Sequence, residues 1–156
     1  MIDDILAITP GEGAIADWFI NRLEVQIEQG HWLSADELTS VTEKIVEQLS
    51  NYKTKHQIKS VVVGQSGGVD SALTAALFKQ AGWEVHGVTM PIHQNQDETH
   101  RGIENIDALR LERHNIDLAP QFDSMQELLG AYDSTYKGLQ RQGNIKARLR
   151  MIALYN

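Results

Sequence analysis

The first part of the chain holds two stretches in which apolar residues recur at helical spacing. Over residues 12–29 these apolar positions fall on one broad face. Ser34 and Glu37 then form the pattern of a capping box, which predicts a second helix from Ser34 to about residue 52. We therefore expect a helical lead-in over residues 1–57.

The pattern changes to that of a buried strand at the valine run 61–63, whose β-branched side chains suit a sheet covered on both faces. Residues 64–68 turn the chain, and helix-forming residues follow over 71–79. A second strand is predicted over residues 83–90. A strand, a helix and a strand within about 30 residues form a βαβ unit, so the strands should pair in parallel. Their carboxyl ends should flank one crevice.

Polar residues after this unit predict a loop, and Asp97 or Thr99 should begin a helix that runs through Arg113. Its apolar positions suit a face that lies on a sheet. A third, short strand is expected over residues 114–118. The predicted fold class is therefore α/β: an open parallel sheet with flanking helices, Rossmann-like, preceded by two helices.

Two further helices are predicted toward the end of the chain. Pro120 should terminate the third strand, and a helix should follow over residues 125–140. Gly143 should interrupt the helical pattern before a last helix over residues 144–156. That helical run reaches the last residue with no stop signal, which favours a protein truncated at its C-terminus.

Composition narrows the class of protein. The 156 residues are 42% hydrophobic and 22% charged, which is ordinary for one globular domain. A net charge of −7 argues against a nucleic-acid binder, and the absence of cysteine excludes disulfides. No apolar run approaches the roughly 20 residues that span a bilayer. The acidic start is no secretory signal. We expect a cytoplasmic protein with no membrane or nucleic-acid partner.

The turn between the first strand and its helix has the chemistry of an anion site. Gly67 and Gly68 let a ligand approach the backbone, and the first turn of a helix offers free N–H groups. Ser66 and Ser71 add hydroxyl groups. Asp70 is sensible beside a phosphate if Mg²⁺ lies between them, because Mg²⁺ prefers few carboxylates together with phosphate oxygens.

The spacing of this turn separates it from two common nucleotide motifs. Asp70 stands where the common triphosphate loop needs a lysine, and the glycines do not follow the dinucleotide spacing. The pattern S-G-G-x-D-S, from Ser66 to Ser71, resembles the pyrophosphate loop of ATP pyrophosphatases. That superfamily includes NAD, GMP and asparagine synthetases and tRNA-thiolating enzymes.

A second motif selects one family within it. Residues 143–151 read G-N-x-K-A-R-x-R-M, which resembles a motif of ammonia-dependent NAD synthetases. The resemblance implies the adenine nucleotide alpha hydrolase-like fold. It also implies that residues 1–156 are the N-terminal part of an NAD synthetase domain, with residues 58–156 as a nucleotide-binding α/β portion that is truncated at its C-terminus.

The resemblance further implies a ligase that uses ATP and ammonia to amidate deamido-NAD to NAD, through an adenylated intermediate and with release of AMP and pyrophosphate. The family works as homodimers with Mg²⁺, which Asp70 would hold. Arg148 would contact deamido-NAD, since a guanidinium suits phosphate or carboxylate. The residues implied to bind ATP are Gly64, Gln65, Ser66, Gly67, Gly68, Val69, Asp70, Ser71, Thr89 and Met90.

Several alternatives stay open at this point. The chain could be a GMP synthetase-like or tRNA-thiolating ATP pyrophosphatase, or an inactive nucleotide-binding fragment. Asp70 could merely cap its helix, and Lys146, Arg148 and Arg150 could be surface charges. The histidines show no paired metal-ligand spacing; His86 reads as structural, and His93 and His100 could reach the crevice.

Overall fold

The computed structural model describes residues 17–30, 33–129 and 136–155 and divides the chain into two compact units, 1–43 and 44–156. The first unit holds helix α2 (Asp17–Glu28) and the start of helix α3 (Ala35–His56). The predicted helix over 12–29 is thus confirmed for α2, and its residues 12–16 lie outside the described ranges. None of the described helices has the length and apolarity needed to cross a bilayer.

The capping box at the start of α3 forms as predicted. Ser34 Oγ accepts a hydrogen bond from the Glu37 amide at 3.3 Å, and the Glu37 carboxylate accepts one from the Ser34 amide at 2.8 Å. These bonds hold the pKa of Glu37 below its usual value, because the backbone and hydroxyl donors of Ser34 favour its charged form. The helix then runs to His56, somewhat past the expected end.

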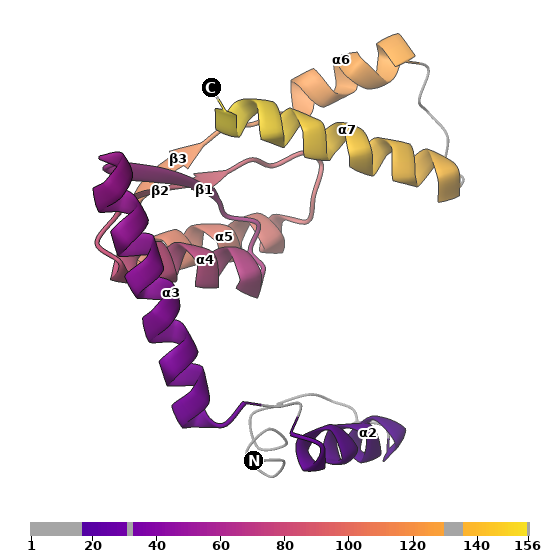
Figure 1. The fold of residues 1–156 in the computed structure, drawn as a ribbon. Helices are drawn as coiled ribbons and strands as arrows, with labels where there is room; N and C mark the ends of the chain where they lie inside the picture. Colours follow the sequence, from indigo (N-terminus) through magenta and orange to yellow (C-terminus); the bar gives the residue numbers. More distant parts are fainter. Residues whose placement is uncertain (1–16, 31–32, 130–135, 156) are drawn as a thin grey trace. The chain divides into compact units, whose positions relative to one another are not determined.

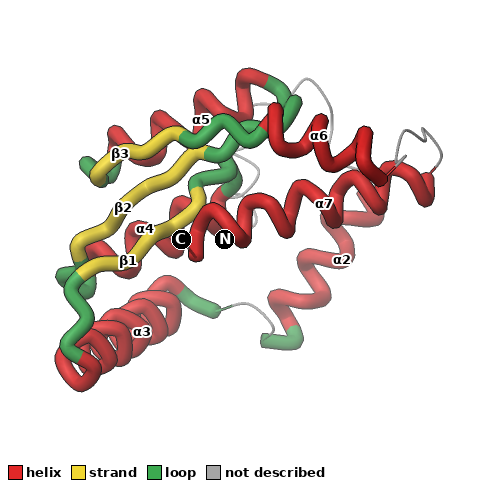
Figure 2. The backbone as a smooth tube through the Cα atoms, turned by 90° about the horizontal axis from the view of Figure 1, so that it is seen from above, coloured by secondary structure: helices red, strands yellow, loops and turns green. Residues whose placement is uncertain are grey.

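Three parallel strands form the sheet of the second unit, in the order β1 (Ser60–Gly64), β2 (Glu84–Thr89), β3 (Glu112–Asn115). Figure 2 shows them side by side. The parallel pairing predicted for the first two strands is confirmed.

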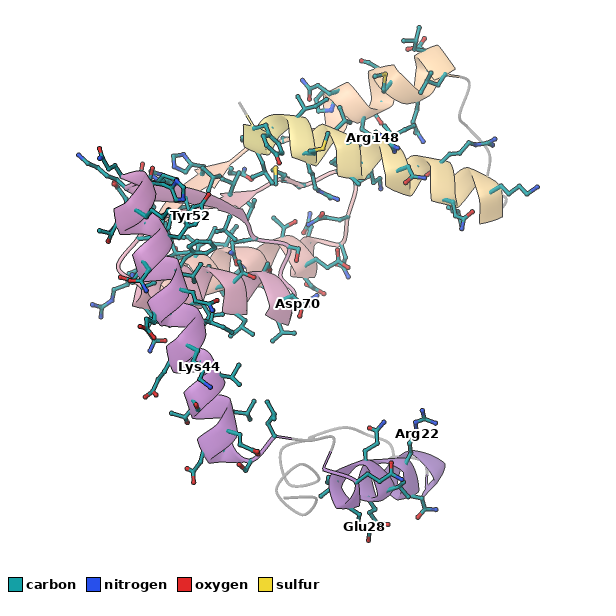
Figure 3. The ribbon with its side chains drawn as sticks, viewed as in Figure 1. Arg22, Glu28, Lys44, Tyr52, Asp70 and Arg148 are labelled. Carbon is teal, nitrogen blue, oxygen red and sulfur yellow. The ribbon has the colours of Figure 1, made fainter. Side chains whose placement is uncertain are left out.

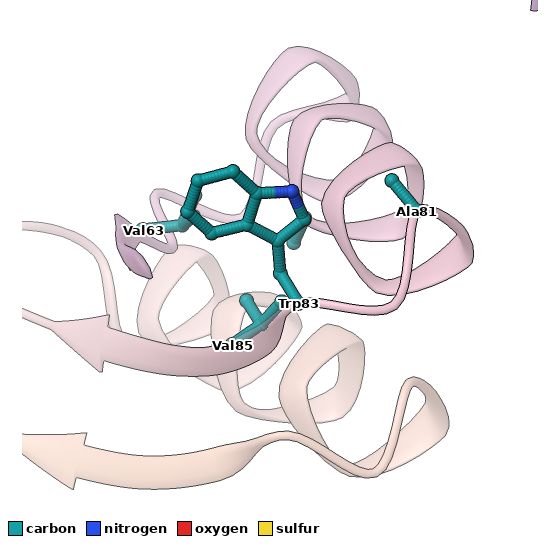
Figure 4. Close-up of a cluster of buried hydrophobic side chains, with 5 residues drawn as sticks. Val63, Ala81, Trp83 and Val85 are labelled. Carbon is teal, nitrogen blue, oxygen red and sulfur yellow. The ribbon is translucent and has the colours of Figure 1, made fainter. Parts of the chain in front are cut away.

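Helices lie on both sides of this sheet. Helices α4 (Val69–Gln80) and α5 (Gln96–Ala108) cover one face, and α6 (Ala119–Leu129) and α7 (Tyr136–Tyr155) lie toward the other (Figure 1). On the α4 side, Val63, Ala75, Ala81, Trp83 and Val85 form a buried cluster (Figure 4). The second cluster joins the strands to α6 and α7 and consists of Val88, Met90, Ile92, Leu118 and Phe122.

The boundary between α5 and β3 differs from the prediction. The helix ends at Ala108 rather than Arg113, Arg110 turns the chain with φ 51°, and β3 begins at Glu112. All four residues of β3 are exposed. The strand therefore carries no apolar run that could place it, and its pairing with β2 defines it instead.

The last two helices also begin elsewhere than predicted. Helix α6 starts at Ala119 with Pro120 in its first turn, where a missing N–H is tolerated, and Asp117 accepts a hydrogen bond from the Ala119 amide at 2.9 Å. Helix α7 continues through Gly143 rather than breaking there. A glycine costs about 1 kcal/mol inside a helix, and packing of Ile145 and Leu149 in the turns that follow offsets that cost.

Candidate nucleotide site

Hydrogen bonds from two serines shape the turn between β1 and α4. The hydroxyl of Ser71 accepts from the Ser66 amide at 3.3 Å and donates to the Gly68 carbonyl at 2.9 Å. The hydroxyl of Ser66 lies 3.2 Å from that of Ser71 and accepts from the Gly68 amide at 3.3 Å. Both hydroxyls therefore fix the backbone of the turn.

The first turn of α4 offers backbone donors to a ligand. Gly68 is the residue before the helix, and no side chain caps it. The first bond within the helix runs from the Ala72 amide to the Gly68 carbonyl. The amides of Val69, Asp70 and Ser71 are the ones that helix geometry leaves without an intrahelical acceptor. Together with the positive end of the helix dipole they suit an anion.

Gly67 lets the turn approach α5 closely. Its φ is +82°, and a Cβ there would lie 2.3 Å from the carbonyl oxygen of Glu98. Gly102 makes the reciprocal contact, because a Cβ on it would lie 2.8 Å from the Gln65 carbonyl oxygen. The two glycines thus let the backbone of the turn lie directly against the helix that follows β2.

A pocket of about 440 Å³ opens beside this turn. It confirms the crevice expected between the ends of the first two strands. The turn, the segment after β2, and helices α5 and α7 all contribute to it, through Gly64, Gln65, Ser66, Met90, Ile92, Gln94, Glu98, Lys146, Arg150 and Leu154.

Gln65 connects the pocket to the sheet. It is 4% exposed, its amide donates to the Val88 carbonyl at 2.8 Å, and its Nε2 donates to the Ser71 carbonyl at 3.1 Å. Its Oε1 is buried and has no hydrogen-bond partner among the described residues. Gln65 thus lines the pocket with an acceptor that is buried beside it and has no partner among the described residues.

Arg150 forms the cationic wall. Its Nε donates to the Met90 carbonyl at 3.1 Å, and its Nη2 donates to Gln94 Oε1 at 2.9 Å. Burial lowers the pKa of Arg150, and the nearby carboxylate of Glu98 acts in the opposite direction. Lys146 lies one turn earlier on α7, with its Nζ 5.0 Å from the centre of the Phe122 ring. The pocket therefore combines two cations, the carboxylate of Glu98, side-chain amides and apolar side chains.

The structure brings together only some of the residues expected from the sequence. Gly64, Gln65, Ser66 and Met90 line the pocket, whereas Gly67, Gly68, Val69, Asp70 and Ser71 form the adjoining turn and the start of α4 without lining it. Figure 3 shows Asp70 on α4 and Arg148 on α7, two helices that lie on different sides of the sheet.

Two expected residues point elsewhere. Thr89 is 1% exposed; its Oγ1 donates to Asn115 Oδ1 at 2.8 Å, and its carbonyl accepts from the Ile116 amide. Arg148 is exposed, and its Nη1 donates to the Asn144 carbonyl of its own helix at 3.2 Å. Neither side chain lines the pocket, so their contacts with ATP and deamido-NAD stay predictions.

Sequence reasoning missed four polar residues of the pocket: Gln94, Glu98, Lys146 and Arg150. The sequence does contain a signal for Lys146 and Arg150. Lys146, Arg150 and Leu154 follow one another at a spacing of four and so share one face of α7. The apolar residues Ile145, Leu149 and Ala153 lie beside that face and pack on the core.

The groups around the turn that could act as metal ligands also suit Mg²⁺. Asp70 presents an exposed carboxylate in the first turn of α4, directly after the amides that suit phosphate. Mg²⁺ is typically held by one or two carboxylates together with phosphate oxygens and water. Asp70 and a bound triphosphate would supply that combination.

Known proteins match this chain over most of its described length. The sequence profile of the NAD synthase family matches residues 41–156. The NH3-dependent NAD(+) synthetase of Mycoplasma pneumoniae is 38% identical over 109 residues, which are 69% of this chain and 43% of that protein. A tRNA-specific 2-thiouridylase of Lachnoclostridium phytofermentans is 60% identical, but over 40 residues, 26% of this chain and 11% of that one.

A solved structure extends the likeness to the fold. The NH3-dependent NAD synthetase from Campylobacter jejuni, in complex with the nitrate ion, superposes with a TM-score of 0.65 at 32% identity, and the match covers 75% of this chain and 50% of that one. The chain thus spans about half the length of the relatives that it matches. The fold is adenine nucleotide alpha hydrolase-like, and the chain belongs to the NAD synthase family.

Proposed function

We propose that this chain supplies the ATP site of an NAD synthetase, which amidates deamido-NAD to NAD with ammonia. The observation that carries the proposal is the uncapped start of α4 beside a pocket that holds Lys146 and Arg150. Backbone donors and two cations suit a triphosphate, whereas Met90, Ile92 and Leu154 suit the apolar faces of a base.

Different residues of the site would bind different parts of MgATP. The amides of Val69, Asp70 and Ser71 would donate to phosphate oxygens, and Gly67 keeps that backbone close to α5. Arg150 is held by the Met90 carbonyl and Gln94, so its guanidinium is preorganised when a phosphate arrives. Asp70 would hold Mg²⁺, which when bound offsets the charge that develops on the departing pyrophosphate.

The reaction that this site would serve has two displacements. A carboxylate oxygen of the nicotinate group attacks the α-phosphorus of ATP, and the bond to pyrophosphate breaks. Ammonia then attacks the carbonyl carbon of the acyl adenylate, loses a proton, and expels AMP to leave the amide. Adenylation is needed because a carboxylate is a poor electrophile and AMP is a good leaving group. Arg148 would contact deamido-NAD from the exposed side of α7.

Two measurements test this function. The purified chain is titrated with MgATP, and it is incubated with MgATP, deamido-NAD and ammonium while NAD, AMP and pyrophosphate are quantified. Asp70→Ala should weaken MgATP binding at least tenfold and abolish product. Asp36→Ala is the matched control, since Asp36 also lies in the first turn of a helix, and it should change neither.

Each outcome has a meaning. Product from the parent chain that disappears in Asp70→Ala supports the full proposal. Binding that depends on Asp70, without product, limits this chain to the ATP site. Binding that Asp70→Ala leaves unchanged would refute the site.

A homodimer and a cytoplasmic location stay predictions from the family resemblance and the sequence. Sedimentation of the chain with and without MgATP tests the homodimer.

A further inference from the structure

Three side chains with metal-binding groups meet on β2 and β3, away from the nucleotide pocket. The register pairs His86 with Glu112 and Val88 with His114. Residues two apart on a strand point to the same side, so His86, Glu112 and His114 share one face of the sheet. Figure 2 shows β2 and β3 side by side, although they are far apart in the sequence.

This face lies opposite the one that α5 covers. A Cβ on Gly87 would lie 2.6 Å from Ile106 of α5, so Gly87 faces that helix. His86 precedes Gly87 on β2 and therefore faces away from α5. The side chains of His86, His114 and Glu112 are 23%, 44% and 57% exposed. The cluster is therefore accessible to an ion from solvent.

The distances between the ligand atoms match those around a tetrahedral ion. His86 Nδ1 lies 3.2 Å from His114 Nε2 and 3.4 Å from Glu112 Oε2, and His114 Nε2 lies 3.5 Å from Glu112 Oε1. Zinc at about 2.0–2.1 Å from nitrogen and oxygen places neighbouring ligand atoms about 3.3 Å apart. The two ring nitrogens already lie at that spacing, and each has one oxygen of the Glu112 carboxylate near it, Oε2 beside His86 and Oε1 beside His114. One ligand atom from each of the three residues lies within 4.8 Å of the others, so a small rotation of the carboxylate would bring a single oxygen to both nitrogens.

The kinds of ligand point to the same ion. Neutral imidazole suits zinc, copper and nickel, whereas Mg²⁺ prefers oxygen ligands. Two imidazoles and one carboxylate give the site a single negative charge, which favours the binding of a dication. Three protein ligands with an exposed side leave the fourth position to water. Without an ion, the same groups would only bind one another as a histidine–histidine–glutamate network.

We propose that His86, Glu112 and His114 form a Zn²⁺ site whose fourth position is open to water. The ion joins β2 to β3, which is an edge strand of the described sheet and has four exposed residues. None of the three ligands lines the nucleotide pocket. The site and the ATP site should therefore fill independently.

The test uses the full chain without a histidine tag. Zn²⁺ is titrated by calorimetry in a buffer without chelators, and Co²⁺ is used as a spectroscopic substitute. We expect one Zn²⁺ per chain and the intense visible absorption of four-coordinate Co²⁺. His86→Gln, Glu112→Gln and His114→Gln should each weaken Zn²⁺ binding at least tenfold, while an unchanged far-UV circular dichroism spectrum shows that the variants are folded.

His100→Gln is the matched control, because it breaks another histidine–glutamate contact, between His100 Nε2 and Glu104 Oε1 at 3.2 Å. It should leave the affinity for Zn²⁺ unchanged. Equal loss in this control, Zn²⁺ affinity that the three ligand variants do not lower, or a six-coordinate Co²⁺ spectrum in the parent chain would each overturn the proposal. The Co²⁺ spectrum needs no variant, so a variant that fails to fold leaves the test intact.

Discussion

On the side of the sheet that carries α4 and α5, Ala75 and Ile106 are fully buried, and glycines let backbone and side chains approach closely. On the other side, Val62 is 48% exposed and His86 is accessible, while Lys146 and Arg150 project from α7 into the pocket. The first side is dominated by packing, and the second carries polar groups that can meet ligands. Both sides hold a buried cluster, and the start of α4 with Asp70 belongs to the first side, so the difference is that the second side adds exposed polar groups to its core.

The largest effect on stability should come from removing a buried side chain on the face of the sheet that α4 and α5 cover. Ile106→Ala removes a fully buried side chain beside Gly87 and should lower the free energy of unfolding by about 2–5 kcal/mol. Val62→Ala, on the exposed face, should cost less than about 1 kcal/mol. Urea unfolding followed by circular dichroism measures both. Equal losses would show that the two faces are packed alike.

An intermediate effect should separate two arginines of α7. Arg150→Met removes a charged donor from the pocket wall, and such a bond is worth about 1.5–3 kcal/mol, so MgATP binding should weaken roughly 10- to 100-fold. Arg148→Met should leave MgATP binding unchanged and weaken binding of deamido-NAD. Calorimetry with each ligand checks both. The reverse pattern would mean that the family motif, rather than the pocket, identifies the ATP-binding arginine.

The smallest effect lies outside the sheet, at the capping box of α3. The pKa of Glu37 is lowered in the folded chain, so its contribution to stability is present above the unfolded value of 4.5 and is lost as pH falls through the lower folded value. Glu37→Gln should remove that part of the acid dependence of helicity, which appears as the pH falls below 4.5. Glu47→Gln in the same helix should keep it. Circular dichroism across this range distinguishes the two variants.

Local signals predicted the part of the fold that holds the turn. Three valines followed by a glycine-rich turn and helix formers can be interpreted without knowledge of distant residues, and β1 and α4 form accordingly. The capping box of α3 was equally local. In each case the residues that predict the element lie within it or directly beside it in the sequence.

The elements that were misplaced depend on distant contacts. Strand β3 has four exposed polar residues, so the sequence places it over residues 114–118, and its register with β2 shows that it runs from Glu112 to Asn115. Gly143 should break a helix on propensity alone, yet α7 runs through it, and the apolar residues that follow it, Ile145 and Leu149, pack on the core. Arg150 was no more conspicuous in the sequence than Arg148, because burial distinguishes them and burial is set by the whole fold.

The bond from Arg150 to the Met90 carbonyl joins residues 60 positions apart. The turn at Gly67 can form once β1, β2 and their neighbouring helices have been made, but the wall of the pocket closes only when α7 docks. We therefore expect the pocket to assemble late in folding, since non-local contacts form slowly. A nucleotide that binds the closed pocket would shift the docking equilibrium toward the docked helix. Amide hydrogen exchange along α7 would therefore slow when the ligand is bound, even at residues that never touch it.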